Sequence, residues 1–329
     1  MSELIKVGIA GTGAYAPQRV MTNDDFAKLV DTSDEWITRR TGIKRRHFAA
    51  ADEATSDLAL EAARGALEAA SVDPADLDLI IVGTLTPDFY LPSCAVLVQD
   101  ALGAKHAGAF DVASACTGFL TAMQTGEAFI ASGRAKRVLV IGAEVLSRYL
   151  DMTDRTSCIL FGDAAGAAVL MPHADCGQGE ILKGSCGADG SAYEVIHMRG
   201  GGSRNPPTRE SLERGDHFIT LRGRDVYRFA VTKLAELIGE MTAGYDPDEI
   251  SLVVPHQVNA RIIESAIERA EVPPEKVVVN IDEYGNTSAA TVPVALHEAL
   301  RDGRIEKGKL VVLVAFGAGL TWAASLVRW

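Results

Sequence analysis

The sequence lacks a long hydrophobic run. No apolar stretch in the chain approaches the roughly 20 residues that a membrane-spanning helix needs. The first residues, MSELIKVGIAGTG, contain no basic segment followed by an apolar core, so we expect no secretory signal peptide. Both features argue against a membrane protein and predict a cytoplasmic location.

Cysteine is scarce as well, with five in 329 residues. No C-x-x-C pair and no Cys/His pair has the spacing of a metal site, and the number of cysteines is odd. We therefore expect neither a disulfide framework nor a bound metal. The five cysteines are Cys94, Cys116, Cys158, Cys176 and Cys186.

Positive charge is in deficit. The formal net charge is −12, which argues against nucleic acid as a general partner. Basic residues still gather in two islands, at 39–46 and at 222–228. Such islands are often solvated surface, but in an acidic protein they are also where phosphates or an acidic partner would dock. Their members are Arg39, Arg40, Lys44, Arg45, Arg46, Arg222, Arg224 and Arg228.

What is present is an ordinary α/β composition, 47% hydrophobic with 31 glycines. Apolar runs bounded by turn residues alternate with stretches of helical period. The middle of the chain, 173–216, changes character, and its part GGGSRNPPTRESLERGD (200–216) is rich in glycine, proline and charge, so we expect a loop there. The expected strands are 6–16, 78–83, 109–112, 137–143, two short ones within 157–171, and 251–255; the expected helices include 56–70, 93–102, 116–133 and 224–243.

The second half of the chain repeats the first. Asp-Pro pairs at 73–74 and 246–247 each follow a helix and precede an apolar strand. The stretch 132–144 likewise matches 302–316, so the two offsets, 173 and 170, are nearly equal. We predict a duplication with a boundary near residue 175, which gives the halves 1–175 and 176–329. Two βαβ-type halves would pack back to back, with helices between and outside them.

The stretch 109–133 predicts a strand followed by a buried helix, because no charged residue lies between Val112 and Gly126. Cys116 stands at the start of that helix. The free N–H groups and the positive dipole there favour a thiolate, so Cys116 is a candidate nucleophile with a lowered pKa. The alternative is a buried cysteine that acts as a small hydrophobic residue.

Two further residues stand at matching places in the second half. His256 follows the strand SLVVP, and Asn286 precedes the helix that corresponds to the one after Cys116. Open α/β sheets place their chemistry at such strand ends. A loop histidine and an N-cap asparagine are the alternatives. An NAD-binding enzyme is a weaker hypothesis, because GTG at 11–13 lacks a third glycine and a following helix.

With these features the sequence resembles the thiolase-fold condensing enzymes, most closely the β-ketoacyl-acyl-carrier-protein synthase III family. The resemblance covers essentially the whole chain. It implies an α/β thiolase fold with duplicated halves in a five-layer α-β-α-β-α sandwich, and a homodimer. The motifs that carry it are GTGAYAP (11–17), DTSDEWITRRTGIKRRH (31–47), DVASACTGF (111–119), TDRTSCILFGDAAGAAVL (153–170), VPHQVNARII (254–263), YGNTSAATVP (284–293) and FGAGLTWAASLVRW (316–329).

The resemblance implies a Cys116–His256–Asn286 triad for a decarboxylative condensation. Cys116 would take the acyl group from an acyl-CoA, and malonyl-acyl-carrier protein would then lose CO2 and attack it. His256 and Asn286 would bind the enolate oxyanion, and the backbone N–H groups of Cys116 and Ala318 the oxyanion on the acyl carbonyl. No metal or redox cofactor is implied. The product would be a 3-oxoacyl-acyl-carrier protein that starts type II fatty acid synthesis.

Other positions carry over from the family as binding residues. Trp36 and Arg155 would sandwich the adenine of CoA, while Arg40, Asn259 and Arg261 would lie at its phosphates. Arg228 and Arg261 would dock the acidic carrier protein.

The acyl pocket would be shaped by Phe316 and by Leu91, the latter reaching in from the partner subunit. Relatives have Phe where this chain has Leu91, so a primer longer than acetyl, or branched, fits the sequence. Two alternatives stay open. One is a related acyltransferase or ketosynthase of a secondary-metabolite pathway, and the other is an idle subunit that only binds.

Overall fold

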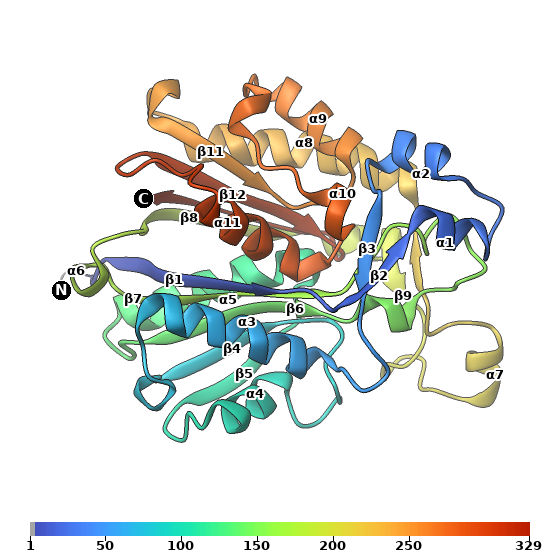
Figure 1. Ribbon diagram of the computed structural model, residues 1–329, viewed down its shortest axis with the longest axis horizontal. Helices are drawn as coiled ribbons and strands as arrows, with labels where there is room; N and C mark the ends of the chain where they lie inside the picture. Colours follow the sequence, from blue (N-terminus) through green and yellow to red (C-terminus); the bar gives the residue numbers. More distant parts are fainter. Residues whose placement is uncertain (1–3) are drawn as a thin grey trace.

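The computed structural model describes residues 4–329 (Figure 1). In this part of the chain nine strands follow one another in the order β11-β12-β13-β8-β1-β7-β6-β4-β5. A single residue pair, Gly8 with Glu180, joins β1 to β8, so two sheets meet there edge to edge. The strands are β1 (Val7–Tyr15), β4 (Leu79–Gly83), β5 (Gly108–Val112), β6 (Val138–Glu144), β7 (Ala164–Pro172), β8 (Glu180–Ala188), β11 (Ile250–Pro255), β12 (Leu310–Gly317) and β13 (Thr321–Arg328).

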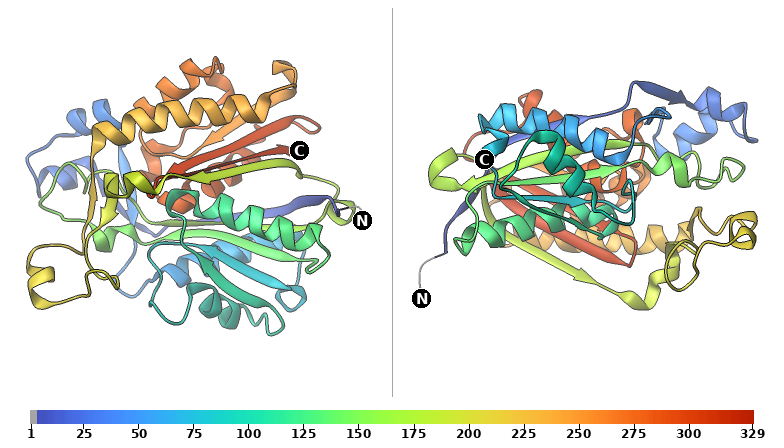
Figure 2. Two further views of the ribbon diagram at one scale, coloured as in Figure 1. Left: turned by 180° about the vertical axis from the view of Figure 1, so that it is seen from behind. Right: turned by 90° about the horizontal axis from the view of Figure 1, so that it is seen from below.

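Helices cover both sheets and also separate them. α5 (Gly118–Ala131) and α11 (Thr291–Arg301) share one hydrophobic core with strands of both sheets. α3 (Thr55–Ala70) and α4 (Cys94–Leu102) pack on the outer face of one sheet, α8 (Gly223–Thr242) and α9 (Ala260–Arg269) on that of the other. Figure 2 shows α8 along the outside and α5 on the inner side. These five layers confirm the expected α-β-α-β-α sandwich.

The central strands form because their sequences suit burial on both faces. β4 (LIIVG) and β6 (VLVIGAE) are buried throughout and pair in parallel, as do β4 with β5 and β11 with β12. Parallel strands require a crossover, and helices supply it here. The buried runs of Val, Ile and Leu in the sequence therefore predict these layers correctly.

The glycines of GTG at 11–13 have a packing role. They lie inside β1, where a Cβ on Gly13 would stand 2.2 Å from the carbonyl oxygen of Ala62 in α3. A Cβ on Gly11 would similarly meet the backbone of Ala70 at 2.4 Å. Glycine here lets α3 lie directly on the strand, which removes the basis of the nucleotide-loop hypothesis.

Short turns repeat the duplication locally. Both Asp-Pro pairs open a one-turn 3₁₀ helix, Pro74–Asp76 and Pro247–Glu249. In each, the preceding aspartate caps the turn by accepting a backbone N–H two residues on. The other 3₁₀ turns are Ala115–Thr117, Leu146–Tyr149, Gly190–Val195, Pro274–Lys276 and Ser288–Ala290.

One expectation about strands was wrong, and one strand was not predicted. The stretch 157–171 contains one strand, β7, since residues 157–160 form turns and Phe161 makes only an isolated bridge to Asn286. The unpredicted strand is β8, which pairs along its length with β13. The sequence KGSCGADG in β8 lacks the β-branched residues that mark strands, and pairing in the sheet overrides that weak propensity.

Apart from α6, which lies beside the N-terminus on the opposite side in Figure 1, the remaining elements lie toward the edge of the sandwich at which α2 is found. Two small hairpin sheets pair β2 with β3 and β9 with β10. The division of the chain at about residue 175 stays a prediction; it falls between β7 and β8. These elements are β2 (Arg19–Thr22), β3 (Arg45–Phe48), β9 (Ile196–Met198), β10 (Ile219–Leu221), α1 (Asn23–Ala27), α2 (Asp34–Thr41), α6 (His173–Cys176), α7 (Arg209–Glu213) and α10 (Ile281–Tyr284).

Within residues 4–329, the longest apolar helices fall short of what is needed to cross a bilayer. The same residues contain no group of three or more His, Cys, Asp or Glu side chains arranged to hold a metal ion.

Candidate active site

Cys116 lies in a tight backbone turn between β5 and α5. The turn, Ala115–Thr117, is a single 3₁₀ turn, and Ala115 has a φ of +49°, which is strained for a residue with a Cβ. The start of α5, directly after this turn, rests on β4, where a Cβ on Gly83 would lie 2.3 Å from the carbonyl carbon of Gly118. We call Ala115–Thr117 the first elbow. It puts Cys116 immediately before the helix, as the sequence predicts.

A second elbow stands at the start of α11. Ser288–Ala290 forms the same kind of turn, and Ser288 has a φ of +50°. Its position is 173 residues after Ala115, the same offset that the duplication predicts. Asn286 comes directly before it, and the N–H of Ser288 donates to Asn286 Oδ1 at 2.8 Å. This bond fixes the amide so that its NH2 group is the end left for the site.

His256 follows β11 and is almost fully buried. Its backbone N–H donates to the carbonyl oxygen of Val314 at 2.8 Å, and its ring Nδ1 lies 2.7 Å from Thr291 Oγ1. The Phe316 ring meets the imidazole edge to face, with centroids 5.5 Å apart. Burial lowers the pKa of His256 to about 3, so the ring is neutral at physiological pH.

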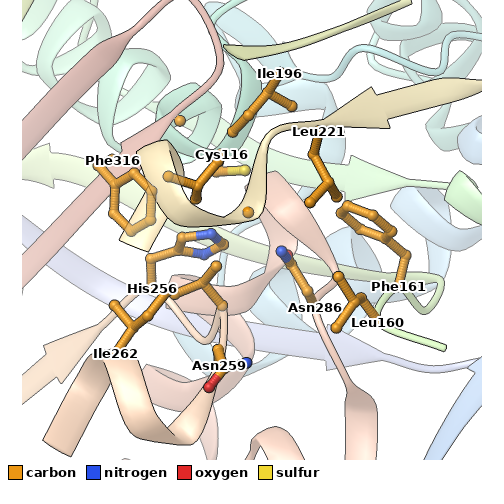
Figure 3. A pocket seen from close by; sticks show the side chains of 14 residues that line it. Cys116, Leu160, Phe161, Ile196, Leu221, His256, Asn259, Ile262, Asn286 and Phe316 are labelled. Carbon is orange, nitrogen blue, oxygen red and sulfur yellow. The ribbon is translucent and has the colours of Figure 1, made fainter. Parts of the chain in front are cut away.

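One cavity of about 120 Å³ receives all three side chains. Figure 3 shows Cys116, His256 and Asn286 around it, with the thiol and the Asn286 amide directed inward. Cys116 comes from the first half of the chain and the other two from the second. Apolar side chains make up most of the wall, namely Leu160, Phe161, Ile196, Leu221, Val226, Val258, Ile262 and Phe316.

The electrostatics of Cys116 differ from the expectation. Burial raises the pKa of the thiol to about 12 and the Glu144 carboxylate adds to the rise, while a hydrogen bond with the Ser288 side chain opposes it. The prediction of a lowered pKa, which rested on the helix start alone, is therefore wrong for the ligand-free protein. Desolvation outweighs the helix terminus at this depth.

Glu144 is a site residue that the sequence interpretation missed. Its carboxylate is completely buried and accepts hydrogen bonds from Thr86 Oγ1 at 2.6 Å, Leu85 N at 3.1 Å and Ser288 Oγ at 3.1 Å. Burial raises its pKa to about 7 in spite of these donors. A charged residue at the end of a strand that is otherwise wholly apolar is the signal that points to it. Ser288 and Thr291, both within the quoted YGNTSAATVP motif, were also missed.

A second pocket, about 440 Å³ in volume, opens beside the cavity. The two share lining residues Leu160, Leu221, Gly223 and Asn259, so they adjoin.

The second pocket brings together the residues expected to bind CoA. The guanidinium groups of Arg40 and Arg155 lie 4.8 and 5.1 Å from the centre of the Trp36 ring. Asn259 Nδ2 donates to the carbonyl oxygen of Arg40 at 3.2 Å, and Asn259 Oδ1 caps α9 by accepting from the N–H of Arg261 at 3.0 Å.

The basic island at 39–46 divides into three parts. Arg39 and Arg40 line a further pocket with Arg261. Lys44 and Arg45 instead pair with Asp282 and Glu283, at 3.2 and 2.6 Å. Arg46 is buried and bonds to Asn23 Oδ1 at 2.8 Å and to the carbonyl oxygens of Met21 and Ile159. The expectation that the whole island binds phosphates is therefore wrong for Arg46, whose role is structural.

The second island lies at the start of α8. Arg222 pairs with Glu194 at 3.0 Å, whereas Arg228 projects from the helix with 82% of its side chain exposed and an ion pair to Asp225 at 3.0 Å. Solvent-exposed ion pairs are weak, so the Arg228 guanidinium stays accessible to a binding partner.

The remaining predicted residues are Ala318, expected at the oxyanion, and Phe316 and Leu91, expected at the acyl pocket. Gly317, next to Ala318, packs against Cys116 so closely that a Cβ on it would stand 2.8 Å from the Cys116 nitrogen. Phe316 is in the cavity wall. Leu91 is not brought to the cavity within one chain; it is 88% exposed, beside Tyr90 at 85% and Phe89 at 58%.

A duplicated five-layer α/β fold with cysteine, histidine and asparagine meeting in one apolar cavity defines a condensing enzyme of the thiolase fold. Family comparison agrees. The model of the C-terminal part of 3-oxoacyl-[acyl-carrier-protein (ACP)] synthase III matches residues 241–329, and the model of 3-oxoacyl-[acyl-carrier-protein (ACP)] synthase III matches residues 110–190. The chain belongs to this family.

Similar proteins cover the whole chain. The β-ketoacyl-[acyl-carrier-protein] synthase III of Caldanaerobacter subterraneus subsp. tengcongensis is 49% identical over an alignment of 331 positions, which covers 100% of this chain and 99% of the relative. The crystal structure of 3-oxoacyl-[acyl-carrier-protein] synthase III from Aquifex aeolicus VF5 has a TM-score of 0.90 at 46% identity and covers 98% of this chain and 100% of its own. The crystal structure of the priming β-ketosynthase of the R1128 polyketide pathway has a TM-score of 0.91 at 34% identity. It covers 100% of this chain and 98% of its own.

Proposed function

We propose that the chain catalyses the decarboxylative condensation of an acyl-CoA primer with malonyl-acyl-carrier protein. The products are 3-oxoacyl-acyl-carrier protein, CoA and CO2, and the reaction starts type II fatty acid synthesis. The observation that carries this proposal is that the two pockets adjoin and share four lining residues. A long thioester fits with its nucleotide in the arginine-lined outer pocket and its reactive carbonyl at Cys116 in the inner cavity.

The first half-reaction moves the acyl group to the enzyme. Cys116 Sγ attacks the thioester carbonyl, its proton leaves, and collapse of the tetrahedral intermediate releases CoA. The backbone N–H groups of Cys116 and Ala318 stabilise the oxyanion. The close packing of Gly317 on the Cys116 nitrogen supports this role, because it holds the two backbone segments side by side.

The second half-reaction forms the carbon–carbon bond. Malonyl on the carrier protein loses CO2, and His256 and Asn286 bind the resulting enolate oxygen. The enolate carbon attacks the acyl-cysteine, and collapse expels the Cys116 sulfur, which takes up one proton overall. The bond from the Ser288 N–H to Asn286 Oδ1 supports the role of Asn286, since it leaves the amide NH2 as the donor.

Charge complementarity supports the two substrates. Arg40, Arg155, Arg261 and Asn259 surround the outer pocket, where a phosphorylated ligand would gain charge-assisted hydrogen bonds. Trp36 offers a flat ring for the adenine. Arg228, exposed on α8, together with Arg261 on the adjacent α9, would attract an acidic carrier protein to a chain that is itself acidic.

We further propose a homodimer. β5 is the edge strand of its sheet, and Phe89, Tyr90 and Leu91 project from the preceding segment with most of their apolar surface exposed. A second copy would cover both features. Leu91 would then complete the partner's acyl pocket, whose small cavity favours a short primer, straight or branched.

The alternative of a secondary-metabolite pathway is weaker. The relative named for that role is 34% identical, against 49% for a β-ketoacyl-[acyl-carrier-protein] synthase III.

Intact mass after brief exposure to a panel of acyl-CoAs tests the function. We expect wild type to gain one acyl group and Cys116→Ala to gain none, and the chain length that loads fastest identifies the primer. Loading of both proteins would move the chemistry away from Cys116. Absence of loading from every CoA would contradict the proposal and favour a subunit that binds without reacting.

A further inference from the structure

The hydroxyl of Thr291 lies against the inner nitrogen of His256. Thr291 is the first residue of α11 and is 2% exposed. Its Oγ1 is 2.7 Å from His256 Nδ1 and 2.9 Å from the carbonyl oxygen of Ser288. Both contacts are at hydrogen-bond distance, and a hydroxyl has only one hydrogen to share between them.

Counting hydrogens assigns the protons. A carbonyl oxygen only accepts, so the Thr291 hydroxyl donates its hydrogen to Ser288. The same Oγ1 must then accept from His256, which requires the proton on Nδ1. If the Thr291 hydroxyl donated to His256 Nδ1 instead, the lone pairs of Thr291 Oγ1 and of the Ser288 carbonyl oxygen would face each other at 2.9 Å. The neutral ring is therefore protonated at Nδ1 and bare at Nε2.

The bare nitrogen belongs to the catalytic cavity. His256 Nε2 is buried and has no hydrogen-bond partner among residues 4–329, while the ring lines the same cavity as Cys116. An unprotonated Nε2 is a proton acceptor there. A ring with the other tautomer would present an N–H and could not take a proton from the thiol.

We propose that Thr291 is a positioning residue that fixes the Nδ1–H tautomer of His256, so that Nε2 serves as the base for Cys116. This inference rests on the proposed function. As Cys116 Sγ bonds to the acyl carbon, its proton moves to Nε2 and the ring becomes an imidazolium. When the carbon–sulfur bond to CoA breaks, that proton passes to the CoA sulfur, and neutral His256 returns.

The same tautomer fits the second half-reaction. That half consumes one proton, which enters at Nε2 and makes it a donor to the enolate oxygen. Collapse of the next intermediate breaks the bond between the acyl carbon and Cys116 Sγ, and the proton passes from Nε2 to the sulfur. The ring again ends neutral with Nδ1–H on Thr291.

The tautomer itself is measurable without any substrate. We would label the seven histidines with ¹⁵N and assign the His256 signals by their absence from His256→Asn. We expect long-range ¹H–¹⁵N spectra of ligand-free wild type to show a protonated Nδ1 and a bare Nε2. A protonated Nε2 in wild type would overturn the proposal whatever the variants do.

Two variants test the function of the tautomer. Thr291→Val keeps the shape and loses the hydroxyl, and Thr291→Ser keeps the hydroxyl. We expect Thr291→Val to shift the proton toward Nε2 and to slow single-turnover acylation of Cys116 about 100-fold, the size of a typical general-base contribution. Thr291→Ser should restore most of the rate and the wild-type spectrum.

A matched control removes a similar bond elsewhere. Thr242 near the end of α8 donates to the carbonyl oxygen of Ile238 at 2.9 Å and has no histidine beside it, so Thr242→Val should leave acylation unchanged. Equal rates for Thr291→Val and Thr291→Ser would refute the inference. If wild type is acylated by no CoA, the proposed function fails instead, while the ¹⁵N spectrum still decides the tautomer.

Discussion

The two elbows have nearly the same backbone and different roles. Ala115 and Ser288 have φ values of +49° and +50°, and in both turns the first residue of the next helix donates its N–H to the carbonyl of that residue. The position after the strained residue is Cys116 in the first elbow and Ala289 in the second. The first therefore presents the thiol, and the second orients the groups that serve it.

The side chains around the second elbow explain this difference. Ser288 orients Asn286 through its N–H and accepts from Thr291 through its carbonyl, and its hydroxyl reaches Glu144. Ala289 is buried, and a Cβ on Gly142 would stand only 2.2 Å from its carbonyl oxygen. The duplicated turn thus carries the cysteine in one half and forms a set of hydrogen bonds in the other.

Moving the cysteine from one elbow to the other should give the largest effect. We expect Cys116→Ala to lower condensation by more than about 1,000-fold, since a nucleophile is removed. Adding Ala289→Cys should not restore it, because position 289 is 1% exposed and does not line the cavity. Acyl loading by mass measures both proteins. Restored loading in the double variant would show that the elbows are interchangeable.

Asn286 belongs to the second elbow alone, since its counterpart in the first is Ala113. Asn286→Asp removes the amide donors and keeps the shape, so we expect condensation to fall by about 100- to 1,000-fold with the carbon–carbon step affected more than acyl loading. Ala113→Ser is the control, for which we expect a change below about threefold. An equal loss in loading would contradict a role confined to the enolate.

Glu144 connects the elbows, because it bonds to Ser288 and acts on Cys116. Burial raises its pKa from 4.5 to about 7, so the folded state holds the proton more tightly than the unfolded state does. The free energy of unfolding should therefore fall by about 3 kcal/mol as pH rises from about 4.5 to about 7, and level off above.

Urea titrations of wild type and Glu144→Gln across this range would isolate the contribution, because other groups titrate alike in both proteins. We expect the difference between the two proteins to change by that amount over the window. Parallel curves would show that Glu144 is charged throughout.

One glycine supports the backbone at each elbow: Gly83 lies against Gly118, the residue that follows the first elbow, and Gly142 lies against Ala289 in the second. A Cβ would meet backbone at 2.3 and 2.2 Å respectively, so we expect Gly83→Ala and Gly142→Ala each to destabilise the fold by about 1–3 kcal/mol. Gly239 in α8 has nothing within 4 Å, and Gly239→Ala should stabilise by about 0.5–1 kcal/mol. Thermal unfolding compares the three. A neutral Gly142→Ala would mean that the second elbow can move.

The sequence by itself determined the layers and singled out the three residues that meet in the cavity. Buried runs such as LIIVG and VLVIGA are continuous apolar stretches bounded by turn residues, and the offset of about 173 placed Asn286 near the counterpart of the Cys116 turn. It also predicted that Trp36, Arg40, Arg155 and Arg261 belong together, through the resemblance to the family.

Only the tertiary structure decided the pKa values and the burial of the ionisable groups. A pKa depends on desolvation and on neighbours distant in sequence, so the helix start at Cys116 suggested the wrong direction and Glu144 went unnoticed. Arg46 looked like its exposed neighbours because sequence does not record burial. The hydrogen bond between His256 Nδ1 and Thr291 Oγ1 joins residues 35 positions apart. Such a contact forms only once the loop after β11 and the start of α11 have packed together.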